Sequence, residues 1–197
     1  FAFSSTTSLT TLSIPSSVTS IGEFAFSDQD SLRTLSIPNS VTSIGIEAFG
    51  SLTSLTALSI PNSVTSIGSY AFAGATSLTT LTIPNSVTSI GGYAFALSPL
   101  ASVTIGDSVK TIEDSAFKGT KLTSVIIPNS VTSIGNSAFY GNALLTTVSM
   151  SDNLINLGVN AFKRNYSLTS VLYCGKVTGF PITPTCSATR QASIDAN

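Results

Sequence analysis

One pattern, S-L-T-x-L-x-I-P-N-S-V-T-S-I-G-x-x-A-F, returns seven times along this chain of 197 residues with little change. Its I-P landmark recurs every 22 or 23 residues, and an eighth, degraded copy is centred on Tyr173. A unit of this length cannot bury its apolar side chains alone and becomes stable only when it stacks on its neighbours. The period therefore predicts a solenoid of about eight coils over residues 1–180, the first one truncated, and a C-terminal cap and flexible tail over residues 181–197.

The apolar positions of one copy predict the path of its coil. In the first full copy, Leu12 and Ile14 alternate with polar residues, as in a short half-buried strand whose hydroxyl groups point outward. Pro15 ends that strand, and Gly22 permits a tight bend. Ala-Phe then closes the coil in a segment too brief for a full α-helix. Each coil is thus expected to be β-rich, with short parallel strands and few or no full α-helices.

Three recurring positions predict how the coils stack. The glycine of I-G is expected at a bend, although Glu113 replaces it in one copy. The asparagine after most prolines is expected to hydrogen-bond a local backbone group. The phenylalanine of A-F should form a continuous aromatic spine in the core. The members of this spine are Phe3, Phe26, Phe49, Phe72, Phe95, Phe117, Phe139 and Phe162.

The combined motif L-x-x-L-x-I-P-x-S-V-T-S-I-G-x-x-A-F resembles the BspA-like subfamily of leucine-rich repeats, and the likeness covers residues 1 to about 180. This resemblance implies a right-handed leucine-rich-repeat solenoid with a parallel sheet on its concave side. Most members of that family are secreted or displayed on the cell surface and adhere to host or matrix proteins, so the resemblance implies the same for this chain. The family has no shared catalytic residues. Gly106 and Ser151 depart from the motif by replacing proline.

Charge is sparse and argues against several partners. The chain carries eight basic and nine acidic residues, and its net charge of −1 gives no strong field toward nucleic acid. No charged residue occurs between Glu47 and Asp107, so Ser, Thr and Asn must solvate that part of the surface. No stretch approaches the roughly 20 consecutive apolar residues of a membrane span. We expect hydrogen-bonding contacts with a protein or glycan partner, without nucleic acid or a membrane span.

The residue types also argue against catalysis. Histidine is absent, which removes the commonest proton shuttle and imidazole metal ligand. The carboxylate pairs Asp28/Asp30 and Glu113/Asp114 are assigned to solvated linkers or bends. No phosphate-binding, nucleophile-elbow or C-x-x-C motif occurs. The sequence therefore predicts a protein that is not an enzyme, with no cofactor and no metal.

The ends of the chain bear on the compartment. Cys174 and Cys186 are either a disulfide that closes a loop over the last coil or two free thiols, and a disulfide would require an oxidising compartment. Asn165 opens an Asn-Tyr-Ser sequence that is a possible glycosylation site. Ala2-Phe3 matches the A-F that closes later copies, so sequence upstream is expected. Together these features favour an extracellular or cell-surface location.

Two sets of positions are candidate partner-binding residues. The outward strand positions carry mostly hydroxyl groups, and Ile126 and Leu172 are apolar exceptions that either anchor a partner or are ordinary substitutions. The position two residues before the spine phenylalanine carries aromatic rings that are either anchors or packed against the bend. The candidate residues are Tyr70, Tyr93, Phe24, Ile126, Leu172, Thr80, Thr82 and Thr104.

Three functions are compatible with this pattern. The leading interpretation is a binding or adhesion module that presents an extended Ser/Thr-rich surface to a protein or glycan. An architectural subunit of a larger assembly is the alternative, because a neighbour could cover the charge-free central block. Ice binding is the third, from a threonine row that Lys110 interrupts. The row contains Thr19, Thr42, Thr65, Thr88 and Thr132.

Overall fold

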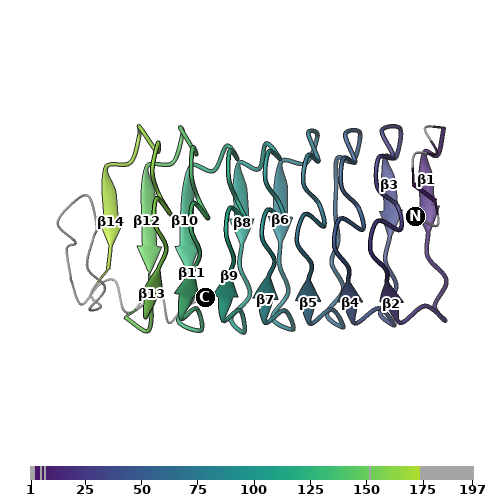
Figure 1. The fold of residues 1–197 in the computed structure, drawn as a ribbon, viewed down its shortest axis with the longest axis horizontal. Helices are drawn as coiled ribbons and strands as arrows, with labels where there is room; N and C mark the ends of the chain where they lie inside the picture. Colours follow the sequence, from purple (N-terminus) through teal and green to yellow (C-terminus); the bar gives the residue numbers. More distant parts are fainter. Residues whose placement is uncertain (1–2, 5, 7, 151, 174–197) are drawn as a thin grey trace.

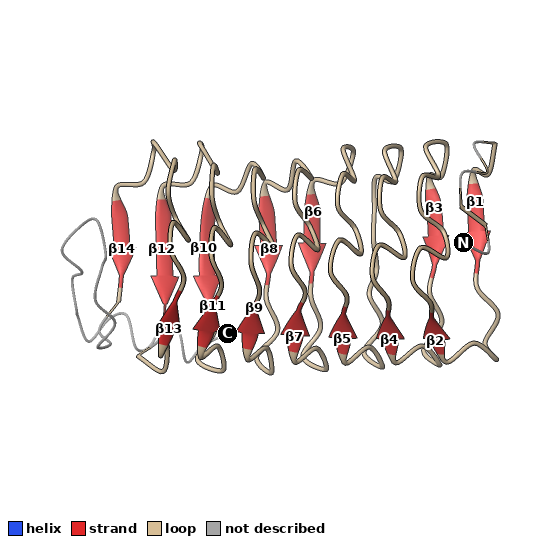
Figure 2. Cartoon of the chain, in the orientation of Figure 1, coloured by secondary structure: helices blue, strands red, loops and turns tan. Residues whose placement is uncertain are grey.

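The computed structural model describes residues 3–4, 6, 8–150 and 152–173. The coils lie side by side in a row along the long axis of the molecule (Figure 1). Strands and turns alternate along the described residues, and no helix occurs among them (Figure 2). The predicted class, a β-rich solenoid of 22–23-residue coils with short parallel strands, is therefore confirmed.

The longer strands form one row, which we call the long-strand row. They are parallel, and residues at equivalent positions of the repeat pair with each other, as Thr11 does with Thr34. The row consists of β1 (Thr11–Ser13), β3 (Thr34–Ser36), β6 (Thr80–Thr82), β8 (Ser102–Thr104), β10 (Ser124–Ile127), β12 (Thr147–Met150) and β14 (Ser170–Leu172). It is divided into three sheets, β1-β3, β6-β8 and β10-β12-β14. It breaks at residues 57–60, which form no strand, and between β8 and β10.

Two-residue strands form a second row, which we call the short-strand row. This row is one continuous seven-stranded parallel sheet. Its members are β2 (Ser20–Ile21), β4 (Ser43–Ile44), β5 (Ser66–Ile67), β7 (Ser89–Ile90), β9 (Thr111–Ile112), β11 (Ser133–Ile134) and β13 (Asn156–Leu157). Each strand turns a Ser, Thr or Asn away from the core and an Ile or Leu toward it.

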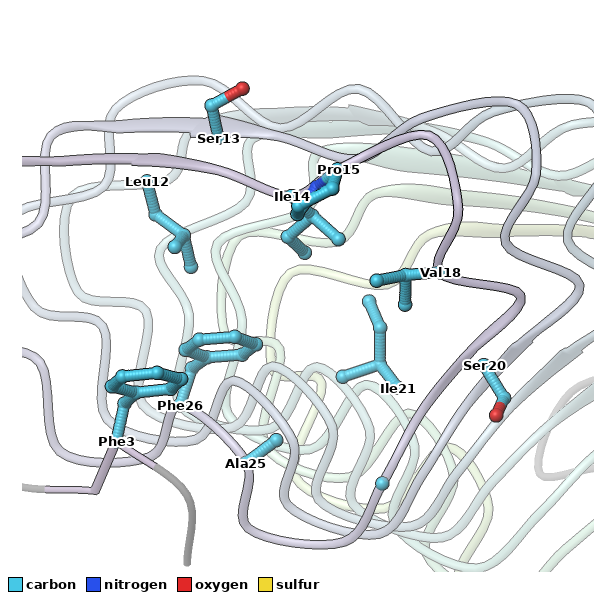
Figure 3. Close-up of a pocket in the computed structure, with 11 residues that line it drawn as sticks. Phe3, Leu12, Ser13, Ile14, Pro15, Val18, Ser20, Ile21, Ala25 and Phe26 are labelled. Carbon is cyan, nitrogen blue, oxygen red and sulfur yellow. The ribbon is translucent and has the colours of Figure 1, made fainter.

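The predicted phenylalanine spine is confirmed. From Phe3 to Phe162, the ring centroids of successive phenylalanines lie 5.2–5.6 Å apart, and the ring planes differ by at most 13°. The members from Phe49 to Phe139 are fully buried, Phe26 and Phe162 are half-buried, and Phe3 is exposed. At that end the first coil leaves a hollow of about 350 Å³ lined by inward side chains such as Leu12, Ile14 and Ile21 (Figure 3). In later coils, a preceding coil covers these positions.

The glycines of I-G have a different role from the one expected. None of them has a positive φ, so the bend does not require them. Instead, a Cβ atom on Gly68 would lie 2.6 Å from the carbonyl carbon of Gly45, and one on Gly158 would lie 2.3 Å from that of Gly135. Gly22, in the first coil, has nothing within 4 Å of its would-be Cβ. Glycine suits this close approach of adjacent coils, although one coil accommodates Glu113 at the same position.

The tight turns lie on either side of Ala-Phe. Two residues before the spine phenylalanine, φ is +51° to +60° in every described coil, and two residues after it φ is +57° to +73°. The left-handed conformation costs a residue other than glycine roughly 1–2 kcal/mol. The first position holds Phe24, Glu47, Tyr70, Tyr93, Ser115, Ser137 and Asn160. The second holds Asp28, Ser51, Gly74, Leu97, Gly119, Gly141 and Arg164.

Polar side chains in the turn after proline connect the coils. Ser63 Oγ donates a hydrogen bond to the Val41 carbonyl at 2.6 Å, and the same bond recurs in neighbouring coils. Asn85 Oδ1 accepts a hydrogen bond from the Asp107 N–H of the next coil, at 2.9 Å. The expectation of a local bond was therefore wrong for Asn85. The polar side chains of this turn therefore hydrogen-bond mainly to the neighbouring coils and less within the turn itself.

Candidate binding surfaces

The strand face consists of the outward side chains of the long-strand row. Alternation along each strand sends leucine, valine and isoleucine inward and hydroxyl groups outward, as Ser13 shows beside Leu12 and Ile14 (Figure 3). Thr82 of β6 lies directly beside Thr104 of β8, because the two strands pair in register. The predicted residues Thr80, Thr82 and Thr104 are all exposed and lie together on this face.

Two shallow hollows indent the strand face. The first, about 420 Å³, lies over residues 57–60, β6 and β8, and Thr80, Thr82 and Thr104 are in its lining. The second, about 310 Å³, lies between β8 and β10, and Thr104 and Ile126 are in its lining. Ile126 is 41% exposed. Four of the predicted residues therefore border one continuous stretch of surface, with Thr104 shared by both hollows.

The hollows lie where the long-strand row breaks. In the third coil, Ala57 stands where Thr34 and Thr80 stand in the neighbouring coils, so a side chain is shorter there. Between β8 and β10 the strands are not paired, although these copies are 22 residues apart, the same spacing that separates the paired strands β6 and β8. Leu172 lies farther along the row on β14, is half-buried and lines neither hollow.

A pair of tyrosines marks a different part of the coil. The rings of Tyr70 and Tyr93 stack with their centroids 4.7 Å apart and their planes 2° from parallel. Tyr70 is 42% exposed and Tyr93 is half-buried. The two rings thus pack on each other and still present their edges to solvent. Phe24 occupies the same repeat position but is separated from the pair by the coil of Glu47.

Cations extend the tyrosine pair toward the C-terminus. Lys118 Nζ lies 5.7 Å from the centroid of the Tyr93 ring and 5.6 Å from that of Tyr140. Arg164 Cζ lies 5.4 Å from the centroid of the Tyr140 ring. We call Tyr70, Tyr93, Lys118, Tyr140 and Arg164 the tyrosine–cation row. The last three members were not among the residues predicted from the sequence, although Lys118 and Tyr140 each follow a spine phenylalanine, one coil apart.

The threonine row considered for ice binding is bonded within the stack. Thr42, Thr65 and Thr88 each donate Oγ1–H to the backbone carbonyl of the preceding threonine in the row, at 3.1–3.2 Å. Thr132 makes the same bond to the Lys110 carbonyl at 3.4 Å. These hydroxyl protons therefore connect one coil to the next and are not free for a layer of ordered water.

The carboxylates examined as possible acid–base pairs also connect coils. Glu113 Oε2 accepts a hydrogen bond from the Gly92 N–H at 3.0 Å, and Asp114 Oδ1 accepts one from the Asn136 N–H at 2.7 Å. Asp30 Oδ1 accepts the Thr53 hydroxyl proton at 3.0 Å. Within the described ranges, no three acidic, cysteine or histidine side chains gather as metal ligands would.

Asn165 belongs to a buried polar column. It is 8% exposed, and its Oδ1 accepts a hydrogen bond from the Asn142 N–H at 2.8 Å. Asn142 in turn accepts a hydrogen bond from the Thr120 hydroxyl through Oδ1 and donates to the Phe117 and Phe139 carbonyls through Nδ2. The Nδ2 atom of Asn165, which a glycan would occupy, is buried. This placement does not favour a glycan at Asn165, which the sequence offered as a possible glycosylation site.

Some predictions concern residues outside the described part of the chain. Cys174 and Cys186 lie there, so the disulfide stays a prediction. The boundary between the solenoid and a cap at residues 181–197 lies there too. Among the residues that are described, no helix has the length and apolar character needed to cross a bilayer.

Solved structures with this arrangement of coils are leucine-rich repeat proteins. One from T. pallidum is 31% identical, with a TM-score of 0.62, over 85% of this chain and 68% of that one. One from Bacteroides ovatus is 29% identical, with a TM-score of 0.57, over 88% and 57%. A leucine-rich cell surface protein from Faecalibacterium prausnitzii is 25% identical, with a TM-score of 0.59, over 95% and 63%. This chain thus spans less than two thirds of the last two relatives.

The repeat itself also matches a family model. The BspA type leucine rich repeat region matches residues 1–119 and 65–182, which together cover most of the chain. No curated protein matches the chain. The resemblance first indicated by the I-P-x-S and I-G-x-x-A-F halves of the motif is confirmed. The chain therefore belongs to the BspA type leucine-rich repeat family.

Proposed function

We propose that this protein is a non-catalytic binding and adhesion module, and that its strand face around β6, β8 and β10 holds a protein or glycan partner. The observation that carries this proposal is the pair of hollows that share Thr104. Their lining combines hydroxyl groups with the amides of Asn62 and Asn85 and the exposed apolar side chain of Ile126. A concave surface of this kind, whose lining carries Asp107 as its one charged side chain, suits hydrogen bonding together with one apolar anchor.

Two further observations support the proposal. The acidic side chains that could have formed a catalytic pair accept hydrogen bonds from neighbouring coils, which favours a module without chemistry of its own. The relative from F. prausnitzii is described as a cell surface protein. That likeness supports the proposal that this protein is secreted or displayed on the cell surface, where an adhesion module would meet its partner.

The test is to block the hollows without disturbing the fold. The variant carries Thr82→Arg and Thr104→Arg, two neighbouring outward residues of β6 and β8. The control carries Ser13→Arg and Ser36→Arg, neighbouring residues at the same repeat position on β1 and β3. Wild type is first screened against immobilised matrix proteins and glycans, and each ligand that binds is then titrated with both variants.

The hollow variant is expected to weaken binding by about tenfold or more, because bulky charges would fill the contact surface. The control should bind like wild type, and both variants should keep the wild-type thermal unfolding midpoint. Equal loss of affinity in the two variants, or none in the hollow variant, would refute the assignment of the strand face.

A fixed subunit of a larger assembly is the second candidate. It is favoured by the absence of any charged residue between Glu47 and Asp107, a block that a neighbouring subunit could cover. Size-exclusion chromatography of native extract separates the two candidates. A free module elutes near the size of its own chain, whereas an assembly subunit elutes almost wholly in a large complex.

A further inference from the structure

Basic residues gather on one edge of the last coils. The edge follows the spine phenylalanine and comprises residues 118–123, 140–146 and 163–169. It carries Lys118, Lys121, Lys163 and Arg164 and no acidic residue. The equivalent segment of the first coil, residues 27–33, carries Asp28, Asp30 and Arg33. The same edge of the solenoid is thus slightly acidic at one end and basic at the other, although the net charge of the chain is close to zero. We call the basic part the basic edge.

Aromatic rings hold two of these cations in place. Lys118 contacts the rings of both Tyr93 and Tyr140, and Arg164 lies over the Tyr140 ring. A cation over an aromatic face keeps its charge while losing rotational freedom. Among the described residues, no acidic side chain forms an ion pair with the cations of the basic edge. Their charge is therefore available to a partner, and little side-chain entropy remains to be lost on binding.

The spacing of the cations indicates what kind of partner fits. Lys118 and Arg164 are two coils apart, with Tyr140 between them, which is roughly 10 Å along the stack at the spacing of parallel strands. This separation is comparable with the disaccharide repeat of an acidic polysaccharide. An extended peptide presents side chains on one side at intervals of about 7 Å, which does not match the separation.

The aromatic side chains of the edge also suit a sugar chain. Because the rings of Tyr70 and Tyr93 stack on each other, their edges and hydroxyl groups are what this pair offers outward, and these can hydrogen-bond to sugar hydroxyls. Tyr166, on the same edge, is 81% exposed, so its ring is open to contact with the C–H groups of a sugar. We propose that the basic edge binds a linear acidic polysaccharide, with Lys118 and Arg164 as its main contacts to carboxylate or sulfate groups.

This site is separate from the strand face, so its failure would leave the proposed function of that face untouched. The probes are heparin, a sulfated polysaccharide, and polygalacturonate, a carboxylated one, at an ionic strength of about 0.15 M. Dextran, poly-glutamate and single-stranded DNA are the comparison ligands. Wild type is expected to bind at least one of the two acidic polysaccharides more tightly than any comparison ligand.

The variant Lys118→Gln/Arg164→Gln is expected to weaken polysaccharide binding about tenfold and to make its salt dependence shallower, because fewer counterions are released. The matched control is Arg33→Gln/Lys110→Gln, which removes the same charge from other parts of the surface and should leave binding unchanged. A second variant, Lys121→Gln/Lys163→Gln, removes two exposed cations without ring contacts and should weaken binding about threefold. It keeps the test valid if the first variant is unstable.

Tyr140→Leu tests the positioning role of the ring. It keeps every charge, so binding should weaken while the salt dependence stays that of wild type. The proposal is overturned if wild type binds neither acidic polysaccharide, if poly-glutamate or single-stranded DNA binds as tightly, or if the matched control loses as much affinity as Lys118→Gln/Arg164→Gln.

Discussion

The short-strand row and the long-strand row belong to the same coils but accept different amounts of variation. The short-strand row is unbroken across seven coils, and a Cβ atom on Gly91 would lie 2.5 Å from the carbonyl carbon of Gly68. The long-strand row is broken at residues 57–60 and between β8 and β10, and both breaks open into hollows. Close backbone contact on one side holds the stack together and leaves the other side free to vary, which is where we place recognition.

The largest effect is expected when a methyl group is added to the short-strand row by a Gly→Ala substitution. Gly91→Ala is expected to lower the free energy of unfolding by about 1–3 kcal/mol, because its Cβ would overlap the backbone of Gly68 and Ser69. Gly22→Ala is the matched control at the end of the row, where nothing lies within 4 Å. It should be neutral or stabilising by up to about 1 kcal/mol. Chemical denaturation compares the two, and equal effects would contradict the close-contact explanation.

A smaller effect is expected at the turn that joins the two rows. Ser63→Ala removes the hydrogen bond to the Val41 carbonyl and should cost about 0.5–1.5 kcal/mol. Ser130 occupies the same repeat position, but its Oγ atom is buried without a hydrogen-bond partner. Ser130→Ala should therefore be neutral or slightly stabilising. If thermal unfolding midpoints fall equally for both variants, the bond between coils is not what Ser63 contributes.

The smallest effect is expected on the long-strand row. Thr80→Val and Thr82→Val change outward, exposed side chains and should alter stability by less than about 0.5 kcal/mol. If denaturant unfolding shows that either variant loses more than about 1 kcal/mol of the free energy of unfolding, this row is as constrained as the short-strand row. The comparison between the rows would then fail.

The repeat predicted the features that every copy shares. The period, the alternation at Leu12 and Ile14, and the recurrence of phenylalanine are sufficient to place the spine and most of the strands, because burial selects the same residue type in each coil. Residues 57–60 carry the same alternation and form no strand. The left-handed turns could not be predicted in this way. Their positions hold residues as different as Glu47, Tyr70 and Leu97, which have no common backbone preference.

Contacts between coils also could not be predicted from the sequence. The glycines were assigned to a bend because one copy read alone gives no sign that another backbone lies against it. Lys118 meets Tyr93 and Tyr140 only through the stacking of three successive coils, from two different repeat positions. The candidate strand face was partly predictable, since Thr80, Thr82 and Thr104 follow from strand alternation. The hollows depend on breaks in strand pairing, and the near-identical copies of the repeat do not predict where those breaks occur.

The central claim is that adjacent coils lie in register, so that equivalent residues are direct neighbours. It is tested most directly by cysteine pairs on the short-strand row, where Ser43 pairs with Ser66, and Ser66 with Ser89. Under mild oxidation, Ser43→Cys/Ser66→Cys should form a disulfide, whereas Ser43→Cys/Ser89→Cys, two coils apart at roughly 10 Å, should not. Peptide mapping by mass spectrometry identifies the linked residues. Absence of the first disulfide, or equal formation of the second, would contradict the register.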